Sequence, residues 1–506
     1  MKNKLKKIIS LGMAATMIFS LSACSGKSGD AGKGGSSDGS SEGKTTIKWY
    51  LAGSGPQADV KTVQDEINKY LAEEHDMDID LQLIMTDYGN YPQKMQMVIS
   101  SGEEYDICWT SDWNNNYYEN INKNAFVELD DLLDEYAPEL KASMDEGVWD
   151  ATRVKGSIYG VPAQQIFSKQ NYVVVVKKYA DKYGLDTSTV HSLKDLEDFF
   201  IQVKKDNPEM YPFAASSNGI VGKSNLSIGF EPIAGSQVPG VIRLDQTDYK
   251  VLNQYKDMPE LLDFYKMMYR WQQEGLVRQD AATVSDNAVP DMKAGKHIAC
   301  VNATYKPGVE TVESNNFGGK EVVVIPISEG YSATTSMVSS LNAISRTSKN
   351  PELAMKLLNL VNTDAKLYNL LCFGIEGTHY TLNDEGKAVS DDSKGYNPNV
   401  DWMFGNQFNG LLREGQADDD WERTKEMNEN ATPSRIRGFS FDSTAVTNEM
   451  AAVSSVVDQY ALSLETGAVD PEATMPQFIE KLEAAGSQTI VKEMQKQLDE
   501  WVAENK

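Results

Sequence analysis

The residues best suited to binding chemistry lie in a loop that follows a short apolar segment. After a predicted strand at 107–110 the chain reads Ser-Asp-Trp-Asn-Asn-Asn-Tyr-Tyr over residues 111–118. Flat aromatic rings stack on the faces of sugar rings, and carboxylates and amides pair with neighbouring hydroxyls. We therefore expect Trp109 and Trp113 to stack on a ligand and Asp112 to accept its hydrogen bonds. A polar surface loop with two half-buried rings would give the same pattern, so this alternative stays open.

Further aromatic and amide side chains occur at similar positions. Trp49 lies near the end of the first predicted strand and Tyr88 follows the second, so three strand ends each carry a ring. Ligands of open α/β sheets bind outside the carboxyl ends of the strands, where these rings would meet. A later aromatic segment, 396–408, could bind ligand or equally pack in the core. The candidate ligand contacts are Trp49, Tyr88, Trp109, Asp112, Trp113, Gln164, Gln165, Glu376, Trp402, Asn406 and Gln407.

Alternating strand and helix patterns would position these loops. Residues 47–51 and 79–85 alternate apolar and polar side chains, which predicts strands. Between them, apolar residues recur every three or four positions over 60–71, as on one face of a helix. A second helical pattern at 91–99 leads to the strand at 107–109. This order predicts an α/β fold whose mainly parallel sheet has helices on its faces.

Similar signals continue along the chain. Ser192 with Asp195 predicts a capped helix, and Asn350-Pro351 predicts another helix start. Short strands are predicted at 173–176, 298–301 and 322–325, and the last seventy or so residues are mainly helical in pattern.

Motifs for catalysis, nucleotides and metals are missing. The segment at 53–56 lacks the third glycine of a dinucleotide fingerprint, and the one at 219–224 has two residues between its glycines where a P-loop needs four. The four histidines are scattered, and no CxxC, HExxH or GxSxG pattern occurs. We predict no catalytic residue, no metal and no cofactor. An anchored glycan-active enzyme remains an alternative, because the many acids could form a carboxyl pair.

Charge excludes one class of partner. The chain of 506 residues has 74 acidic and 48 basic side chains, and its formal net charge is −26. A protein that binds duplex nucleic acid needs a basic face, and no Lys/Arg-rich stripe occurs beyond the first seven residues. We therefore predict no nucleic-acid partner. The length fits about two to four domains.

The N-terminus is typical of an exported protein. Four lysines within residues 1–7 precede a mostly apolar stretch that is too short and too polar to span a membrane. It ends in Leu21-Ser22-Ala23-Cys24, which resembles the lipobox of bacterial lipoproteins, in which the cysteine is acylated. A plain secretory signal is the alternative. We predict a signal peptide at 1–23, a lipidation site at Cys24 and a flexible Gly/Ser-rich tether over 24–44.

Several segments resemble extracellular solute-binding proteins of ABC importers. They occur in the family's order, at 99–107, 129–134, 155–162, 177–186 and 293–297. Three later segments resemble a lipoprotein subfamily with a helical C-terminal domain of unknown function (DUF3502), at 350–364, 374–380 and 405–408. The resemblance covers nearly all of residues 45–503. It contains no ligand-contact signature, so the candidate residues rest on position and chemistry.

The resemblance implies a periplasmic-binding-protein-like fold, in which two α/β lobes are joined by crossing hinge strands and close on a ligand. We expect an N-terminal lobe at 45–163 plus about 302–345, a C-terminal lobe at 164–301 plus about 346–430, and a helical region at 431–506. Gln164 and Gln165 follow the first crossing. The expected protein is a monomeric lipoprotein on the extracytoplasmic face of the cell membrane that passes an oligosaccharide or sugar to ABC permease subunits. A receptor for a peptide or another small polar solute is the alternative.

Overall fold

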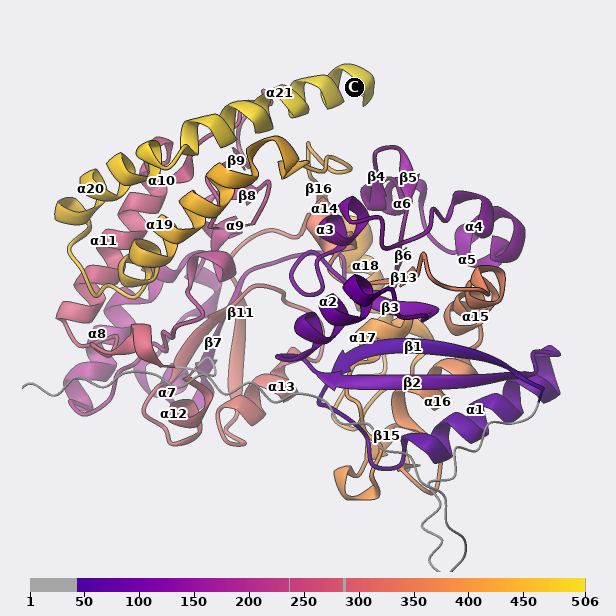
Figure 1. Ribbon diagram of the computed structural model, residues 1–506. Coiled ribbons are helices and arrows are strands. Elements are labelled where there is room, and N and C mark those ends of the chain that lie inside the picture. Colours follow the sequence, from indigo (N-terminus) through magenta and orange to yellow (C-terminus); the bar gives the residue numbers. More distant parts are fainter. Residues whose placement is uncertain (1–42, 236, 285–287, 506) are drawn as a thin grey trace, which may run out of the picture. The chain divides into compact units, whose positions relative to one another are not determined.

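The computed structural model describes residues 43–235, 237–284 and 288–505. The predicted signal peptide, Cys24 and the tether up to residue 42 therefore lie outside the described residues. From Lys44 onward the chain forms one unit, whose elements are labelled in Figure 1.

A five-stranded sheet forms the centre of the first half. Its strand order is β2-β1-β3-β13-β6, with β1 parallel to β2 and β3, and β13 antiparallel to β3 and β6. The strands are β1 (Thr45–Gly53), β2 (Ile79–Asp87), β3 (Ile107–Thr110), β13 (Leu341–Ile344) and β6 (Val161–Pro162). The predicted alternation of strands and helices is confirmed, because α1 (Val60–His75) and α2 (Tyr91–Ser101) connect the three parallel strands. Gly102 ends α2 in the left-handed region, at φ 68°.

Helices and short strands complete this half. They bury apolar stripes such as Val63, Ile67 and Leu71 of α1 against the sheet. They are α3 (Tyr117–Asn122), α4 (Asp130–Tyr136), α5 (Pro138–Ala142), α6 (Glu146–Thr152), β4 (Arg153–Val154), β5 (Ser157–Ile158), α15 (Pro351–Thr363), α16 (Ala365–Phe373), β14 (Tyr380–Leu382), β15 (Ala388–Ser390) and α17 (Asp401–Phe404).

An antiparallel three-stranded sheet forms the centre of the second half. The strand β7 (Tyr172–Val176) lies between β10 (Ala299–Asn302) and β11 (Val322–Pro326). All five residues of β7 are buried, which suits a run of valines in a central strand. Around it lie α7 (Lys177–Tyr183), α8 (Glu197–Asp206), α9 (Asn225–Ile228), β8 (Phe230–Pro232), β9 (Val241–Arg243), α10 (Gln254–Asp257), α11 (Pro259–Gln273), α12 (Val289–Lys293) and α13 (Val309–Asn316).

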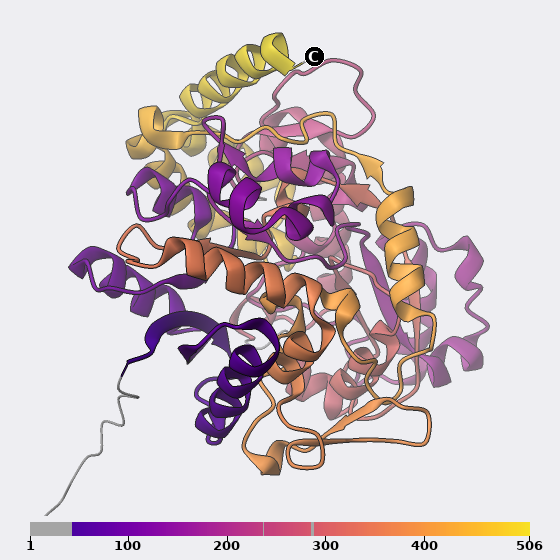
Figure 2. The same ribbon diagram turned by 90° about the vertical axis from the view of Figure 1, so that its right-hand side faces the viewer.

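The C-terminal helices belong to the second half. They are α19 (Thr447–Glu465), α20 (Pro471–Ala484) and α21 (Ser487–Asn505). Figure 1 shows them beside α10 and α11, and Figure 2 shows the yellow C-terminal helix at the top of the view. Their apolar residues, from Val453 to Leu498, join the same hydrophobic core as β7. The helical pattern predicted for this end is confirmed, and the helices share a core with the second lobe.

Two hydrophobic cores thus define two lobes, and their membership differs from the predicted division in two places. Helices α15 to α17, expected in the C-terminal lobe, pack in the first core, where α15 contacts α4, α5 and β13. Strand β11, expected in the N-terminal lobe, pairs with β7 over five residues in the second sheet. An amphipathic helix or an apolar strand fits either core by its pattern, so long-range pairing decides its place.

Three segments connect the lobes, at 163–171, 328–337 and 405–435. They contain β12 (Tyr331–Ser332), α14 (Thr334–Met337), α18 (Asp420–Asn430) and β16 (Thr432–Pro433). Strand β12 pairs in parallel with β16, and Lys169 and Tyr331 exchange two backbone hydrogen bonds of 2.8 Å. Because the three crossings are bonded to one another, the lobes share one hinge.

Candidate functional site

A cavity of about 840 Å³ lies where the two lobes and the crossings meet. The first lobe contributes Asp112 and Trp113, the second contributes Leu226 and Glu231, and the crossings contribute Lys169 among others. A volume of this order suits a small ligand held by a few polar groups on an apolar lining.

Four aromatic side chains form a cluster at the first lobe's side of the cavity. The rings of Tyr88 and Trp402 are stacked, with centroids 6.3 Å apart and planes at 7°. Trp113 lies 5.3 Å from Trp109 and 6.2 Å from Trp402. Trp109 is fully buried beneath the cluster, whereas Trp113 exposes 56% of its surface. A cluster with one so widely exposed indole offers a ready stacking surface.

Hydrogen bonds hold the indoles in place. Trp113 donates its Nε1–H to the carbonyl of Ser339 at 2.9 Å, and Trp109 donates its own to Ser340 Oγ at 3.0 Å. The Ser340 hydroxyl in turn donates to the backbone carbonyl of Trp402 at 3.1 Å. The ring faces are therefore oriented before any ligand arrives.

On the same side of the cavity as the aromatic cluster (together the first wall), Asp112 has a carboxylate oxygen without a hydrogen-bond donor in the described part of the chain. Its Oδ1 atom is buried without a hydrogen-bond partner among the described residues. Burial raises the pKa of Asp112 to about 6, although the positive charge of Lys169 opposes the rise. A buried acceptor without a donor costs free energy, and a hydroxyl or amide N–H of a ligand would supply the missing donor.

Buried polar groups line the opposite side. Glu231 Oε2 accepts hydrogen bonds from Tyr331 Oη at 2.7 Å and Ser434 Oγ at 2.6 Å. Burial raises the pKa of this carboxyl. Lys169 donates from Nζ to Thr335 Oγ1 at 3.2 Å. Lys306 also lines the cavity, and burial lowers its pKa, while the charge of Asp401 offsets part of the fall.

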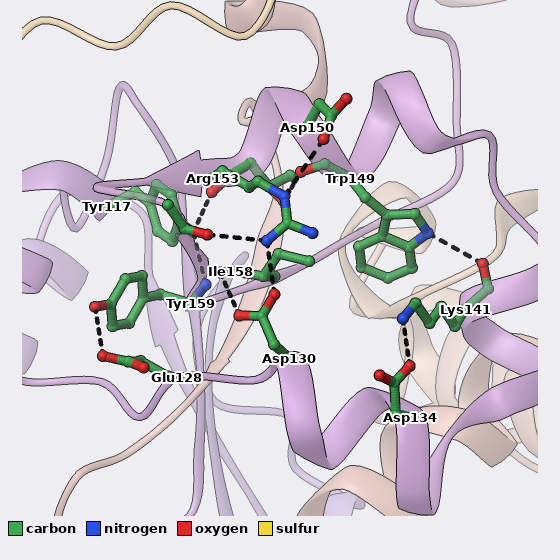
Figure 3. A network of polar contacts seen from close by, with 12 residues as sticks. Tyr117, Glu128, Asp130, Asp134, Lys141, Trp149, Asp150, Arg153, Ile158 and Tyr159 are labelled. Carbon is green, nitrogen blue, oxygen red and sulfur yellow. Dashed lines mark hydrogen bonds and ion pairs between the residues drawn. The ribbon is translucent and has the colours of Figure 1, made fainter. Parts of the chain in front are cut away.

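A polar network in the first lobe, shown in Figure 3, includes Tyr117 of α3. The next residue of this helix, Tyr118, lines the cavity. Tyr117 donates from its hydroxyl to the Thr152 carbonyl at 2.8 Å and accepts from the Tyr159 amide at 3.1 Å. Arg153 binds Asp130 at 2.6 Å, so the turn between β4 and β5 is tied to α4. The Tyr117 side chain thereby ties α3 to the backbone at the end of α6 and to the backbone just after β5.

Six of the predicted contacts lie at or directly behind the cavity. Asp112, Trp113, Gln165 and Trp402 line it. Trp109 and Tyr88 lie behind them and support their rings. The prediction that separate strand ends gather aromatic rings therefore agrees with this arrangement.

The other five predicted contacts lie elsewhere. Trp49 is fully buried in the first core, where its Nε1–H donates to Asn342 Oδ1 at 3.0 Å. The Gln164 side chain donates to Ser143 Oγ at 2.8 Å, and the Gln407 amide donates to the Gln164 carbonyl at 2.8 Å. Asn406 accepts from the Phe408 amide as a turn cap, and Glu376 is exposed beside β14. None of these five is in the cavity lining.

Most residues on the side of the cavity opposite the tryptophan cluster (the second wall: Lys169, Glu231, Lys306 and Tyr331) were not predicted from the sequence. Glu231 had a detectable signal, since it stands between Phe230 and Pro232 in a short apolar strand. Lys169 follows Gln165 in the same crossing and could have been included by position. Tyr331 and Lys306 have no distinguishing local pattern.

The described residues lack the groupings expected of a metal site or a membrane span. No group of three or more His, Cys, Asp or Glu residues could hold a metal ion there. The described cysteines, Cys108, Cys300 and Cys372, are buried and unpaired. Within the same residues no helix has the length and apolar character to cross a bilayer.

Two family models match the chain. One is described as bacterial extracellular solute-binding protein and matches residues 54–366. The other is described as a domain of unknown function (DUF3502) and matches residues 435–503. A carbohydrate ABC transporter substrate-binding protein of Streptococcus pneumoniae serotype 4 (strain ATCC BAA-334 / TIGR4) is 30% identical over 521 residues, with 100% of both chains covered.

Solved structures of other binding proteins are also similar to this chain. The N-glycan transport solute binding protein (NgtS) from Streptococcus pneumoniae has a TM-score of 0.81 and 27% identity, covering 92% of this chain and 100% of that one. Its complex with Man5GlcNAc has a TM-score of 0.71 at 27% identity, with 92% and 100% covered. The alginate-binding protein AlgQ2, at 17% identity and a TM-score of 0.61, covers 90% of this chain and 98% of its own, and supports the fold alone.

Proposed function

Because the chain belongs to the family of bacterial extracellular solute-binding proteins, we propose that it captures an oligosaccharide or sugar in the cavity between its lobes. The protein would then deliver the ligand to the permease of an ABC transporter. The observation that carries the proposal is the exposed Trp113 beside Trp402 at the cavity surface, where hydrogen bonds hold the Trp113 indole and the Trp402 backbone.

The relatives support this choice of ligand class. The protein that is 30% identical is named a carbohydrate substrate-binding protein, and NgtS has been solved with Man1GlcNAc and with Man5GlcNAc. Tryptophan faces with a nearby free carboxylate suit such neutral, hydroxyl-rich ligands. A peptide would also use the aromatic wall, so the binding test includes one.

The mechanism is hinge closure without a chemical step. Two lobes joined by three crossings can rotate as bodies about the place where the crossings are bonded to one another, at Lys169, Tyr331 and Thr432. A ligand that contacts both walls favours the closed arrangement by its differential affinity for it. We expect no cleavage of glycans by the pure protein, and incubation followed by mass spectrometry of the sugar would detect any.

Lipid anchoring at Cys24 completes the proposal. The protein would be tethered at the extracytoplasmic face, with residues 1–23 removed and residues 24–44 as the tether. We expect Cys24→Ser to release the protein from the membrane fraction. Retention of that variant in the membrane would contradict the anchor.

The main test is binding by titration calorimetry. The probes are Man1GlcNAc, Man5GlcNAc, a short peptide mixture and a polyol. We expect Man5GlcNAc to bind and Trp113→Ala to weaken it by about 10- to 100-fold, as loss of a central aromatic contact does in other interfaces.

The chain offers a matched control. Trp421 is half-buried and donates its Nε1–H to the Gly410 carbonyl at 2.8 Å, as Trp113 does to Ser339, but it lies outside the cavity lining. Trp421→Ala should leave affinity within about twofold. Unchanged binding by Trp113→Ala would remove the proposed site, and binding of peptide without any sugar would refute the carbohydrate assignment.

A further inference from the structure

The region matched as a domain of unknown function reaches into the cavity. Phe439, Ser440, Phe441 and Ser443, from the segment between β16 and α19, are part of the cavity lining. Met450, in the first turn of α19, joins them. These residues belong to 435–503, which matches the domain of unknown function and lies outside the solute-binding family match at 54–366.

The segment is held from behind by the last helix. The Asp442 amide donates to Gln497 Oε1 at 2.9 Å, and Gln497 Nε2 donates back to the Asp442 carbonyl at 2.9 Å. The rings of Phe439 and Trp501 lie 5.9 Å apart. Two reciprocal hydrogen bonds and a ring contact from α21 fix the backbone that carries Phe441.

The same segment is bonded to the hinge. The Gly438 amide donates to Thr334 Oγ1 at 2.9 Å, and Ser434 Oγ donates to Glu231 at 2.6 Å. Thr334 and Glu231 also line the cavity. The C-terminal region is therefore continuous with the second wall.

Contacts also extend to the first lobe. Asp442 forms an ion pair with Lys155 at 3.5 Å. Lys155 stands in the turn between β4 and β5, which Figure 3 shows tied to α4 through Arg153 and Asp130. Burial and the charge of Asp112 raise the pKa of Tyr118, and a side-chain hydrogen bond with Ser440 offsets part of that rise. The side chains of Tyr118 and Ser440 therefore lie close together.

We propose that residues 435–450 form a third wall of the binding cavity and that Phe441 in this wall determines specificity for longer sugar chains. The inference rests on the proposed function and adds to it a role for the C-terminal region. Phe441 brings an aromatic ring to a lining whose second-lobe members are aliphatic and polar, such as Leu226, Ile233 and Asn225.

The ring's place in the chain explains the expected selectivity. The tryptophan cluster belongs to the first lobe and Phe441 to a segment backed by α21, so a ligand that contacts both aromatic surfaces must bridge two different parts of the cavity lining. A longer chain that extends toward the third wall gains a second aromatic surface. The third wall thus contributes to affinity only for ligands that reach it.

The test compares two ligands and three variants by titration calorimetry. Phe441→Ala should weaken Man5GlcNAc about tenfold and leave Man1GlcNAc within about twofold, whereas Trp113→Ala should weaken both. Phe441→Leu keeps apolar volume without a ring and should also lose selectivity, which guards against a variant that misfolds. Thermal unfolding of each variant verifies that the fold is kept.

Phe408→Ala is the matched control. Phe408 is likewise half-buried, packs on Trp421 and lies outside the cavity lining, so its loss should not alter either affinity. If the Phe441 variants weakened both glycans equally, or neither, the proposed role of the third wall would be wrong, although the protein would still bind sugar. If the wild-type protein bound neither glycan, the proposed function would fail and the inference with it.

Discussion

The first wall of the cavity rests on the carboxyl end of β3, the central strand of a sheet, whereas the second is made of loops held by buried polar side chains. On the first wall, Trp109 belongs to β3, and Trp113 and Trp402 pack on it. The Tyr91 hydroxyl of α2 donates to the Trp109 carbonyl at 2.8 Å. Neighbours in one core therefore fix this surface.

The second wall depends on partners far away in the chain. Glu465, at the end of α19, accepts hydrogen bonds from the Ile220 and Val221 amides at 2.6 and 3.0 Å. Asn171, in a crossing, accepts from the Leu226 amide at 2.9 Å. Gly219 has φ +72°, and a Cβ there would lie 2.6 Å from Glu465 Oε2. Small movements of α19 or of the hinge would thus be transmitted to the loop that lines the cavity.

This difference assigns separate tasks to the two walls. A surface fixed within one core suits the first encounter with a ligand, because its rings are already oriented. The second wall is bonded to the hinge and to α19, so its position changes when those elements move. It is therefore suited to the movement of the lobes that follows ligand binding.

The largest expected effect is on the stability of the first wall. Trp109→Ala empties a fully buried indole site and should lower the free energy of unfolding by about 3–5 kcal/mol, measured by urea denaturation. Trp113→Ala, which removes an exposed ring, should cost less than about 1 kcal/mol. If the two variants lost equal free energies of unfolding, the aromatic cluster would act as one unit. Trp109 could then not be separated, as a supporting residue, from Trp113 as the ligand contact.

The second wall should respond to a residue that never touches ligand. Glu465→Ala leaves two backbone amides without their acceptor and should destabilise the protein by about 2–4 kcal/mol. It should also weaken ligand binding severalfold, because the 219–224 loop leads into α9 and the cavity lining.

Glu465→Gln is the control for this effect. It keeps an oxygen acceptor at the same place and should recover most of the stability and affinity. Urea denaturation and calorimetry on both variants measure the two quantities. If Glu465→Ala lost stability but bound ligand as tightly as the wild type, the loop would not transmit the position of α19.

The first wall was largely predictable from the sequence because its signal is local. Tyr88 and Trp113 follow strands, and the rule that ligands bind beyond carboxyl strand ends places them together. Trp49 was wrong as a cavity contact for a definite reason. β1 continues to Gly53, so Trp49 lies inside the strand and faces Asn342 of β13 rather than the strand's end.

The second wall was not predictable in the same way. The segment at 219–224 was predicted to be a loop rather than a P-loop, and it forms a turn that includes a short 3-10 helix at Val221–Lys223. Its amides nevertheless bind a carboxylate, that of Glu465, which is 245 residues distant from Ile220. No periodicity in a single sequence pairs two such residues. The exchange of α15–α17 and β11 between lobes has the same cause, since their patterns specify burial without specifying the partner.

The smallest expected effect on stability concerns pH, and it separates the acceptors of the two walls. Glu231 already accepts two hydrogen bonds at Oε2, whereas Asp112 Oδ1 has no partner among the described residues, so ligand hydroxyls should donate to Asp112. Burial raises the pKa of Asp112 to about 6. Folding therefore disfavours the charged form of Asp112. The free energy of unfolding is unaffected by this group below about pH 4, where the carboxyl is neutral in both states, and it falls as pH rises through 6.

Ligand binding should show the opposite dependence. Hydroxyl donors favour the ionised carboxylate, so affinity should rise with pH and be about tenfold weaker at pH 5 than at pH 7, with protons released on binding near pH 5. Asp112→Asn removes the titrating group and should bind with an affinity that is nearly level across this range. Calorimetry in buffers of different ionisation enthalpy measures both the affinity and the released protons. A slope that persists in Asp112→Asn would assign the titration to another group, and would leave the first wall a purely aromatic surface.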